Sequence, residues 1–174
     1  VSNPAQFYAE AAFRDCGWSG HFRNPAVADF NGDGIDDFFS VSKLILSNNG
    51  KLVDVSHTNL PQDFFFNTDI GPMWSHDIAI GDSEGDGDID IFLPVNKYTY
   101  DHKQVPFTML INDGTGYFTV NQNFPNIPQP WEVGMSHEEG RLWATTAAIG
   151  DFDNDGHGDV SVGWFNPRFA NRFR

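Results

Sequence analysis

Acidic side chains recur at one fixed spacing in three stretches of the chain, "DFNGDGIDD" from Asp29, "DSEGDGDID" from Asp82 and "DFDNDGHGD" from Asp151. In each nine-residue stretch, side chains that carry oxygen occupy places one, three, five and nine, and place six is glycine. The side chains are Asp29, Asn31, Asp33 and Asp37 in the first loop, Asp82, Glu84, Asp86 and Asp90 in the second, and Asp151, Asp153, Asp155 and Asp159 in the third. Like charges held this close repel each other, so the pattern predicts a bound cation.

The donor atoms and their spacing favour Ca²⁺. This ion takes six to eight oxygen ligands at about 2.3–2.6 Å, whereas Mg²⁺ demands octahedral geometry at about 2.0–2.1 Å and keeps several waters. Glycine at place six (Gly34, Gly87, Gly156) permits a turn at positive φ. Place seven is expected to add a backbone carbonyl, so its side chain is free to vary, as Ile35, Asp88 and His157 do. One such loop could be a solvated acidic turn, but three matched copies predict up to three Ca²⁺ ions.

The sequence around these loops excludes the EF-hand and predicts strands. An EF-hand needs a bidentate glutamate at place twelve between two helices, but place twelve holds Ser40, Leu93 and Val162. The flanking stretches are short and apolar: "DIAIG" and "TTAAIG" precede loops, while "DDFFSV", "DIDIFLPV" and "DVSVGW" follow them. These patterns are typical of strands, so each loop is expected to join two strands.

The repeat extends beyond the loops. Trp74, Ala79, Ile80 and Gly81 align with Trp143, Ala148, Ile149 and Gly150. Downstream, "KLILSNNGKLVDVS" matches "FTMLINDGTGYFTV", each an apolar strand, an Asn/Gly turn and another strand. The unit therefore has four strands with the loop between the first two. Successive loops begin 53 and 69 residues apart, a scale typical of propeller blades.

The segments "AVADFNGDGIDDFF", "AIGDSEGDGDIDIFL" and "AIGDFDNDGHGDVSV" resemble the FG-GAP/VCBS repeat. That repeat builds the β-propeller of integrin α chains and occurs in fungal and bacterial lectins and in secreted bacterial proteins. The resemblance covers most of residues 20–165. It implies calcium in each loop, held by the twelve side chains named above, an extracellular or cell-surface location and commonly seven blades. Glu84 departs from the pattern, and its longer side chain calls for a water or a shifted cage.

The expected fold is all-β, with blades of four antiparallel strands in an incomplete propeller. The approximate units are residues 1–20 as a preceding or closing strand, 21–70 as a blade, 71–125 as a blade, and 126–174 as a linker and partial blade. About two and a half to three blades are too few to close a ring, because propellers have at least four. Other blades, from the parent chain or another chain, are therefore expected partners.

Composition narrows the class of partner. The chain has 24 Asp and Glu against 10 Lys and Arg, a formal net charge of −14, which argues against nucleic acid and anionic membranes. No apolar run approaches the roughly 20 residues of a membrane helix, so no membrane insertion is expected. The single Cys16 rules out an internal disulfide and leaves open a buried thiol or an intermolecular bridge.

Two functions remain in view. The favoured one is a calcium-binding extracellular module for adhesion, assembly, or protein or glycan recognition. The alternative is a polysaccharide-acting lyase or hydrolase on a calcium-containing propeller. Its acid–base candidates are His21, His57, His76, His102, and His137 with Glu138 and Glu139. No G-x-S-x-G nucleophile motif or zinc spacing supports catalysis, so no catalytic residue is assigned.

Aromatic side chains offer candidates for ligand recognition. Phe64, Phe65 and Phe66 either stack on sugar rings or fill the wedge between blades. Two linkers, residues 95–107 and 123–143, are longer than a turn requires. Long loops on a rigid scaffold often carry the residues that recognise a ligand. The candidates in these linkers are Tyr98, Tyr100, Trp131 and His137.

Overall fold

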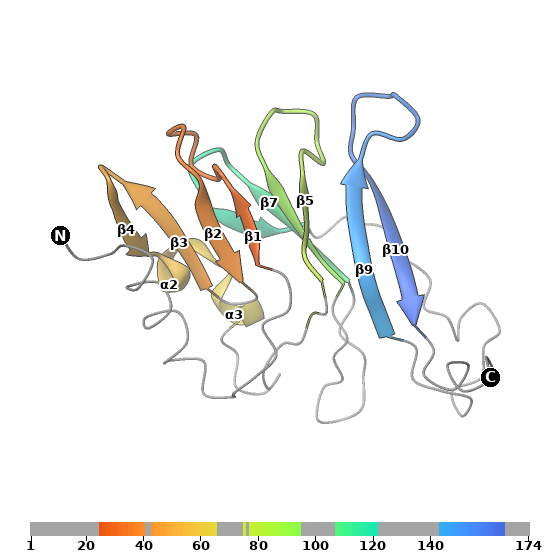
Figure 1. The fold of residues 1–174 in the computed structure, drawn as a ribbon, viewed down its shortest axis with the longest axis horizontal. Helices are drawn as coiled ribbons and strands as arrows, with labels where there is room; N and C mark the ends of the chain where they lie inside the picture. Colours follow the sequence, from red (N-terminus) through yellow and green to blue (C-terminus); the bar gives the residue numbers. More distant parts are fainter. Residues whose placement is uncertain are drawn as a thin grey trace, which may run out of the picture.

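The computed structural model describes residues 25–40, 43–65, 75, 77–94, 107–121 and 143–165 of the 174-residue chain. The expected all-β fold is confirmed: within these ranges, antiparallel strands form two four-stranded sheets and one two-stranded sheet (Figure 1). We call the sheets and their loops the first, second and third units, in chain order.

The first unit runs β1-β2-β3-β4 in chain order. Its strands are β1 (Ala26–Ala28), β2 (Asp37–Ser40), β3 (Lys43–Asn48) and β4 (Lys51–Asp54). The turn between β3 and β4 consists of Asn49 and Gly50, with φ of 51° and 71°. Two consecutive positive φ values define the turn that suits the right-handed twist of a hairpin, and Asn-Gly is the dipeptide that adopts it most readily.

The second unit repeats this order, and the third contains its first two strands. The strands are β5 (Ala79–Gly81), β6 (Asp90–Leu93), β7 (Thr108–Asn112) and β8 (Phe118–Val120), then β9 (Trp143–Gly150) and β10 (Asp159–Phe165). Gly81 pairs with Asp90, and Gly150 pairs with Asp159. The sequence alignment of these two glycines is therefore confirmed, since both face the place-nine aspartate of their own loop.

Two four-residue helices, α2 (Ser56–Asn59) and α3 (Gln62–Phe65), follow β4. The expected all-β fold did not include them. The carbonyl of Val55 accepts hydrogen bonds from the amides of Thr58 and Asn59 at 3.0 and 2.8 Å, which closes the turn of α2. No helix in the described ranges is long and apolar enough to span a membrane. Phe64 and Phe65 belong to α3, but their side-chain surroundings and Phe66 lie outside what the structure describes.

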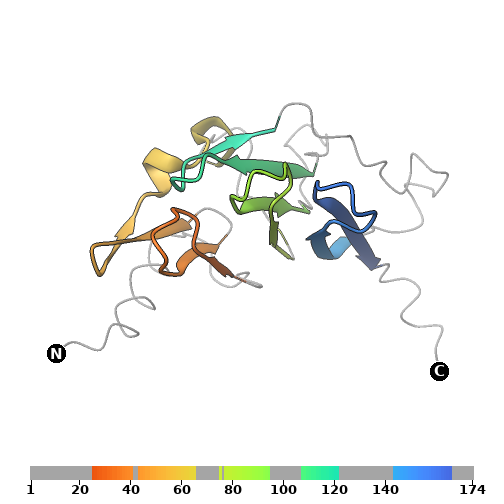
Figure 2. The ribbon, with the colours of Figure 1, turned by 90° about the horizontal axis from the view of Figure 1, so that it is seen from above.

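The units stack in a curved row (Figure 2), and the core lies between them. Phe39 and Leu44 of the first unit pack with Ile91, Leu110 and Phe118 of the second. Ala79, Phe92 and Met109 of the second unit form another cluster with Ile149 and Val160 of the third. Successive strand residues point to opposite faces of a sheet, so the second unit contributes one face to each cluster. We call the face toward the next unit the forward face and the opposite one the rear face.

Candidate metal centre

All three acidic loops lie on the same edge of the row of sheets (Figure 1). The first loop, residues 29–37, joins β1 to β2, the second, residues 82–90, joins β5 to β6, and the third, residues 151–159, joins β9 to β10. Each loop thus connects the first two strands of its unit, as the sequence predicts. The three loops are equivalent parts of a repeated unit.

The place-one carboxylate organises each loop by binding backbone amides across it. Asp29 accepts hydrogen bonds from the amides of Asp33 at 3.1 Å and Gly34 at 2.7 Å. The amides of places five and six donate in the same way to Asp82, at 3.1 and 2.9 Å, and to Asp151, at 3.0 and 2.9 Å. The loops therefore share one backbone course although their sequences differ.

Each loop contains two left-handed residues. At place six, Gly34, Gly87 and Gly156 have φ of 83°, 95° and 93°. At place four, Gly32, Gly85 and Asn154 have φ of 71°, 78° and 63°. Sequence reasoning identified place six but missed place four. Its signal was present, because Asn is one of the few residues besides Gly that tolerate this conformation.

Side chains at places three and five turn back over the loop. In the third loop Asp153 accepts a hydrogen bond from the amide of Asp155 at 3.2 Å, and Asp155 accepts one from the amide of His157 at 2.9 Å. Equivalent bonds link Asn31 to the amide of Asp33, Asp33 to that of Ile35, and Asp86 to that of Asp88. These bonds occupy one oxygen of each side chain and hold it close to its neighbours.

In the first two loops, the place-nine carboxylate anchors the loop to the third strand of its sheet. Asp37 is 2% exposed and accepts hydrogen bonds from the amides of Phe30 at 2.8 Å and Ser47 at 2.6 Å. Asp90 is 1% exposed and accepts from the amide of Asn112 in β7 at 2.9 Å. Burial is the largest influence on the pKa of Asp37 and raises it despite these amides. A nearby positive charge would oppose that rise.

The place-nine aspartate of the third loop is exposed. One oxygen of Asp159 accepts from the amide of Phe152 at 2.9 Å. Ligand atoms of Asp151, Asp153 and Asp159 all lie within 4.8 Å of one another. Within the described ranges this is the one group of three or more His, Cys, Asp or Glu side chains placed to hold a metal ion. Three carboxylates at this spacing form an all-oxygen donor set, which suits a hard cation such as Ca²⁺.

The second loop has the densest negative charge. Burial acts first on the pKa of Asp82 and raises it, but the backbone amides of Gly87, Gly85 and Asp86 outweigh burial and the pKa is lowered. Asp88, at place seven, behaves oppositely: burial and the carboxylates of Asp86, Asp90 and Asp113 raise its pKa. From the sequence, place seven is expected to contribute a backbone carbonyl, with a side chain that is free to vary. In the structure, the side chain of Asp88 adds negative charge to the second loop.

The second and third loops contact each other. The amide of Gly158 donates to the carbonyl of Ser83 at 3.3 Å, and Nδ1 of His157 lies 2.9 Å from the carbonyl oxygen of Glu84. A Cβ atom on Gly85 would overlap the carbonyl oxygen of Gly156. Sequence reasoning missed this contact, because no pattern within either loop shows that the two loops meet.

Several sequence candidates lie outside the described residues: Cys16, His21, Phe66, His76, Tyr98, Tyr100, His102, Trp131, His137, Glu138 and Glu139. His57 is an exposed residue of α2. The acid–base and ligand-recognition assignments for these residues stay predictions.

No protein-family model matches the chain, and no curated protein matches it. The resemblance to FG-GAP/VCBS repeats therefore rests on the residues of the three loops and their flanking strands.

Proposed function

We propose that this chain is a calcium-binding β-propeller segment of the FG-GAP/VCBS type, acting outside the cell in adhesion, assembly, or protein or glycan recognition. One observation carries the proposal: three loops with different sequences adopt the same backbone, with a place-one carboxylate bonded to two amides and left-handed residues at places four and six. A shared backbone that concentrates oxygen atoms is best accounted for by a shared cation.

The donor chemistry supports calcium in particular. Of the twelve expected ligand side chains in the three loops, eleven are carboxylates and one, Asn31 of the first loop, is an amide. Places one, three, five and nine would supply side-chain oxygens, and the carbonyls of Ile35, Asp88 and His157 would supply one more each. These five residues supply five oxygens in each loop, and a bidentate carboxylate or a water would bring the set to the six to eight ligands of Ca²⁺, whereas Mg²⁺ usually keeps several waters.

The blade arrangement and the location belong to the same proposal. The four-stranded sheets stack with the forward face of one against the rear face of the next, which supports their interpretation as propeller blades. Further units would complete the propeller. Extracellular calcium modules bind with dissociation constants of about 10⁻⁴–10⁻³ M, so they fill where free calcium is millimolar. The ions would neutralise the loops and leave the longer linkers to meet a protein or glycan.

Removal of one ligand tests the assignment. We expect the wild-type chain to bind three Ca²⁺ ions by isothermal titration calorimetry and by native mass spectrometry. Asp155→Ala should bind two, because it removes a place-five ligand of the third loop alone. Asp36→Ala is the matched control, since it deletes an exposed carboxylate at place eight of the first loop and should still bind three.

Two results would overturn the proposal. One is a wild-type chain that takes up no calcium at millimolar concentration. The other is an Asp155→Ala variant that retains the full count, which would place the ions elsewhere.

A further inference from the structure

The three units stack in one direction, and the loops take part in the stacking. Phe30, at place two of the first loop, is 1% exposed and meets Phe118 of β8 edge-to-face, with ring centroids 5.7 Å apart. The side-chain amide of Asn112 in β7 also donates to the carbonyl of Phe30 at 2.8 Å. Place two of the first loop therefore docks on the β7–β8 hairpin of the next unit.

The third loop presents the same residue type without a cover. Phe152 is at place two and is 66% exposed. Its amide binds the place-nine carboxylate of Asp159, as the amide of Phe30 binds Asp37. Phe30 and Phe152 therefore occupy equivalent positions in their loops. Phe30 is covered by the β7–β8 hairpin of the next unit, whereas no hairpin among the described residues covers Phe152.

The forward face of the third unit is open in the same way. Ala79 and Phe92 occupy the forward face of the second unit and are buried against the third. Register places Ala148 and Ser161 at the equivalent positions, Ala148 pairing with Ser161 as Ala79 pairs with Phe92. Both residues are exposed. Among the described residues, this end of the row is therefore uncovered.

The rear face of the first unit carries the counterpart. The amides of Ser47 and Asn112 both donate to the place-nine carboxylate of their own unit, so these two residues are equivalent. Leu52 pairs with Ser47, and Phe118 pairs with Asn112. Leu52 therefore occupies the position of Phe118. On the same face Val27 is 54% exposed, Leu52 is half-buried and Ile45 is buried. Ile80 and Ile149, the equivalents of Val27 in the next two units, pack against the preceding unit.

We propose that copies of this chain associate head to tail, with Phe152 of one copy seated against Leu52 on the β3–β4 hairpin of the next. A second copy is the partner because this chain contains both halves of the contact, at opposite ends of the row (Figure 2). The contact repeats the packing of the first unit on the second. It rests on the repeat arrangement in the proposed function, and its test is separate from the calcium count.

Such an association has a definite symmetry. It joins two different surfaces, so each copy keeps one free face of each kind and can add further copies. A contact of this kind closes into a ring if the rotation permits and grows into a filament otherwise. The curvature of the row (Figure 2) favours closure.

Sedimentation velocity over a range of chain concentrations tests the association. We expect the wild-type chain to form larger species as concentration rises, and Phe152→Ser to raise the dissociation constant by at least about tenfold, as for a central aromatic anchor. Tyr117→Ser is the matched control, because Tyr117 is 47% exposed on the second unit, away from both end faces. A wild-type chain that stays monomeric at every concentration would refute the proposal. Equal effects of the two variants would refute it as well.

Cross-linking tests the direction of the contact. In a Cys16→Ser background, Ala148→Cys and Val27→Cys chains are mixed and treated with a short bis-maleimide. These positions leave Phe152 and Leu52 intact, and their equivalents Ala79 and Ile149 belong to one cluster between the second and third units. We expect cross-linked dimers in the mixture and few in either variant alone. Dimers formed equally well by one variant alone would contradict a head-to-tail contact. Calcium is counted in the same samples, so the two proposals have separate readouts. A chain that binds no calcium would contradict the proposed function, and a chain that binds calcium but does not associate would contradict only the head-to-tail contact.

Discussion

At the scale of single residues, glycines in the loops serve two different purposes. Gly87 has φ of 95°, and a Cβ atom there would meet no atom within 4 Å. Gly85 has φ of 78°, and its Cβ would overlap the carbonyl oxygen of Gly156 in the neighbouring loop. Gly87 is therefore needed for its backbone conformation alone, whereas Gly85 also permits the second and third loops to touch.

This difference predicts unequal costs for the same substitution. Gly87→Ala should lower the free energy of unfolding by about 1–2 kcal/mol, the penalty of a left-handed backbone for a residue with Cβ. Gly85→Ala should cost more, since the overlapping atom belongs to backbone and cannot rotate away. Urea unfolding of both variants measures the difference. Gly34→Ala, with φ of 83° and open space around it, is the control and should match Gly87→Ala. Equal costs at Gly85 and Gly87 would mean that the loops do not touch.

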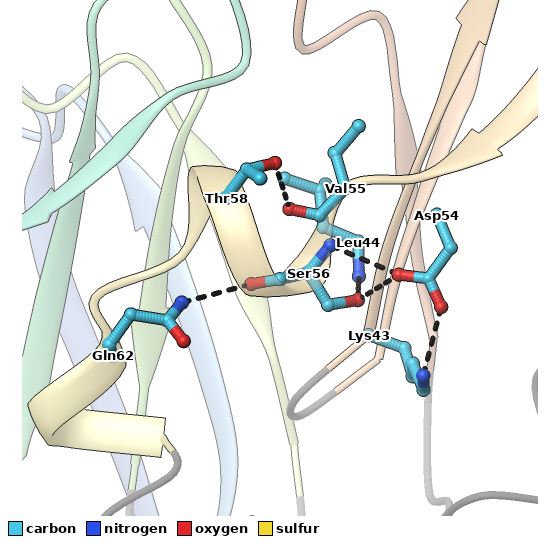
Figure 3. A network of polar contacts seen from close by, with 7 residues as sticks. All are labelled: Lys43, Leu44, Asp54, Val55, Ser56, Thr58 and Gln62. Carbon is cyan, nitrogen blue, oxygen red and sulfur yellow. Dashed lines mark hydrogen bonds and ion pairs between the residues drawn. The ribbon is translucent and has the colours of Figure 1, made fainter.

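At the scale of elements, a polar network holds α2 against the first sheet (Figure 3). The hydroxyl and amide of Ser56 donate to Asp54 at 2.5 and 3.0 Å, and the ammonium of Lys43 lies 2.9 Å from the other carboxylate oxygen. The amide of Leu44 in turn donates to the Ser56 hydroxyl at 3.0 Å. Ser56 is fully buried, so the network ties β3, β4 and α2 together.

The charge of Asp54 makes this corner sensitive to acid. Burial acts first and raises the pKa of Asp54, but hydrogen bonds from Lys43 and Ser56 outweigh it and leave the pKa below its ordinary 3.8. A carboxylate with a lowered folded-state pKa stabilises the fold fully above its unfolded pKa. That contribution disappears as pH falls through the folded value.

Asp54→Asn should therefore lower the free energy of unfolding at pH 7 by up to about 1 kcal/mol, because Asp54 is 43% exposed and its ion pair is screened. The gap between variant and wild type should shrink as pH falls below 3.8. Urea unfolding across this range measures it. Asp63→Asn, at an exposed carboxylate in α3, is the control. A gap that is constant with pH would show that the charge of Asp54 does not matter.

At the scale of the whole molecule, the loops and the packing of units are linked. Phe30 of the first loop is buried against the second unit, and Ser83 and Glu84 of the second loop bond to the third. A cation that fixes a loop therefore also fixes a contact between units. Metal binding is expected to stabilise the row as a whole.

Chelation should reveal this link. With free Ca²⁺ about tenfold above the dissociation constant, each site adds about 1.4 kcal/mol by mass action, and three sites add about 4 kcal/mol. That sum is comparable to much of a domain's net stability. We expect a chelator to lower the melting temperature markedly in differential scanning calorimetry. The control is a triple variant, Asp29→Ala, Asp82→Ala and Asp151→Ala, whose melting temperature should not respond. An unchanged wild-type melt would contradict the link.

The features of the site that could be predicted from the sequence are those set by residues close together in the chain. The spacing of aspartates and glycines placed all three loops between paired strands, and the Asn-Gly dipeptide marked the β3–β4 hairpin, because these features depend on neighbours in the chain. The left-handed conformation at place four could also have been predicted, because its residues are Gly32, Gly85 and Asn154. The helical turns of α2 and α3 were not, since four-residue helices carry too little periodicity to stand out.

By itself, the sequence determined which residues turn, which strands follow each loop and which side chains can offer oxygen to a cation, since backbone conformation and ligand chemistry are properties of short segments. Only the tertiary structure decided that Asp37 and Asp90 are buried, that His157 meets the second loop and that Phe30 is covered while Phe152 is not. Those outcomes depend on residues far apart in the chain that meet when sheets stack, and burial changes the energy of a charge or an aromatic ring only once its neighbours are in place.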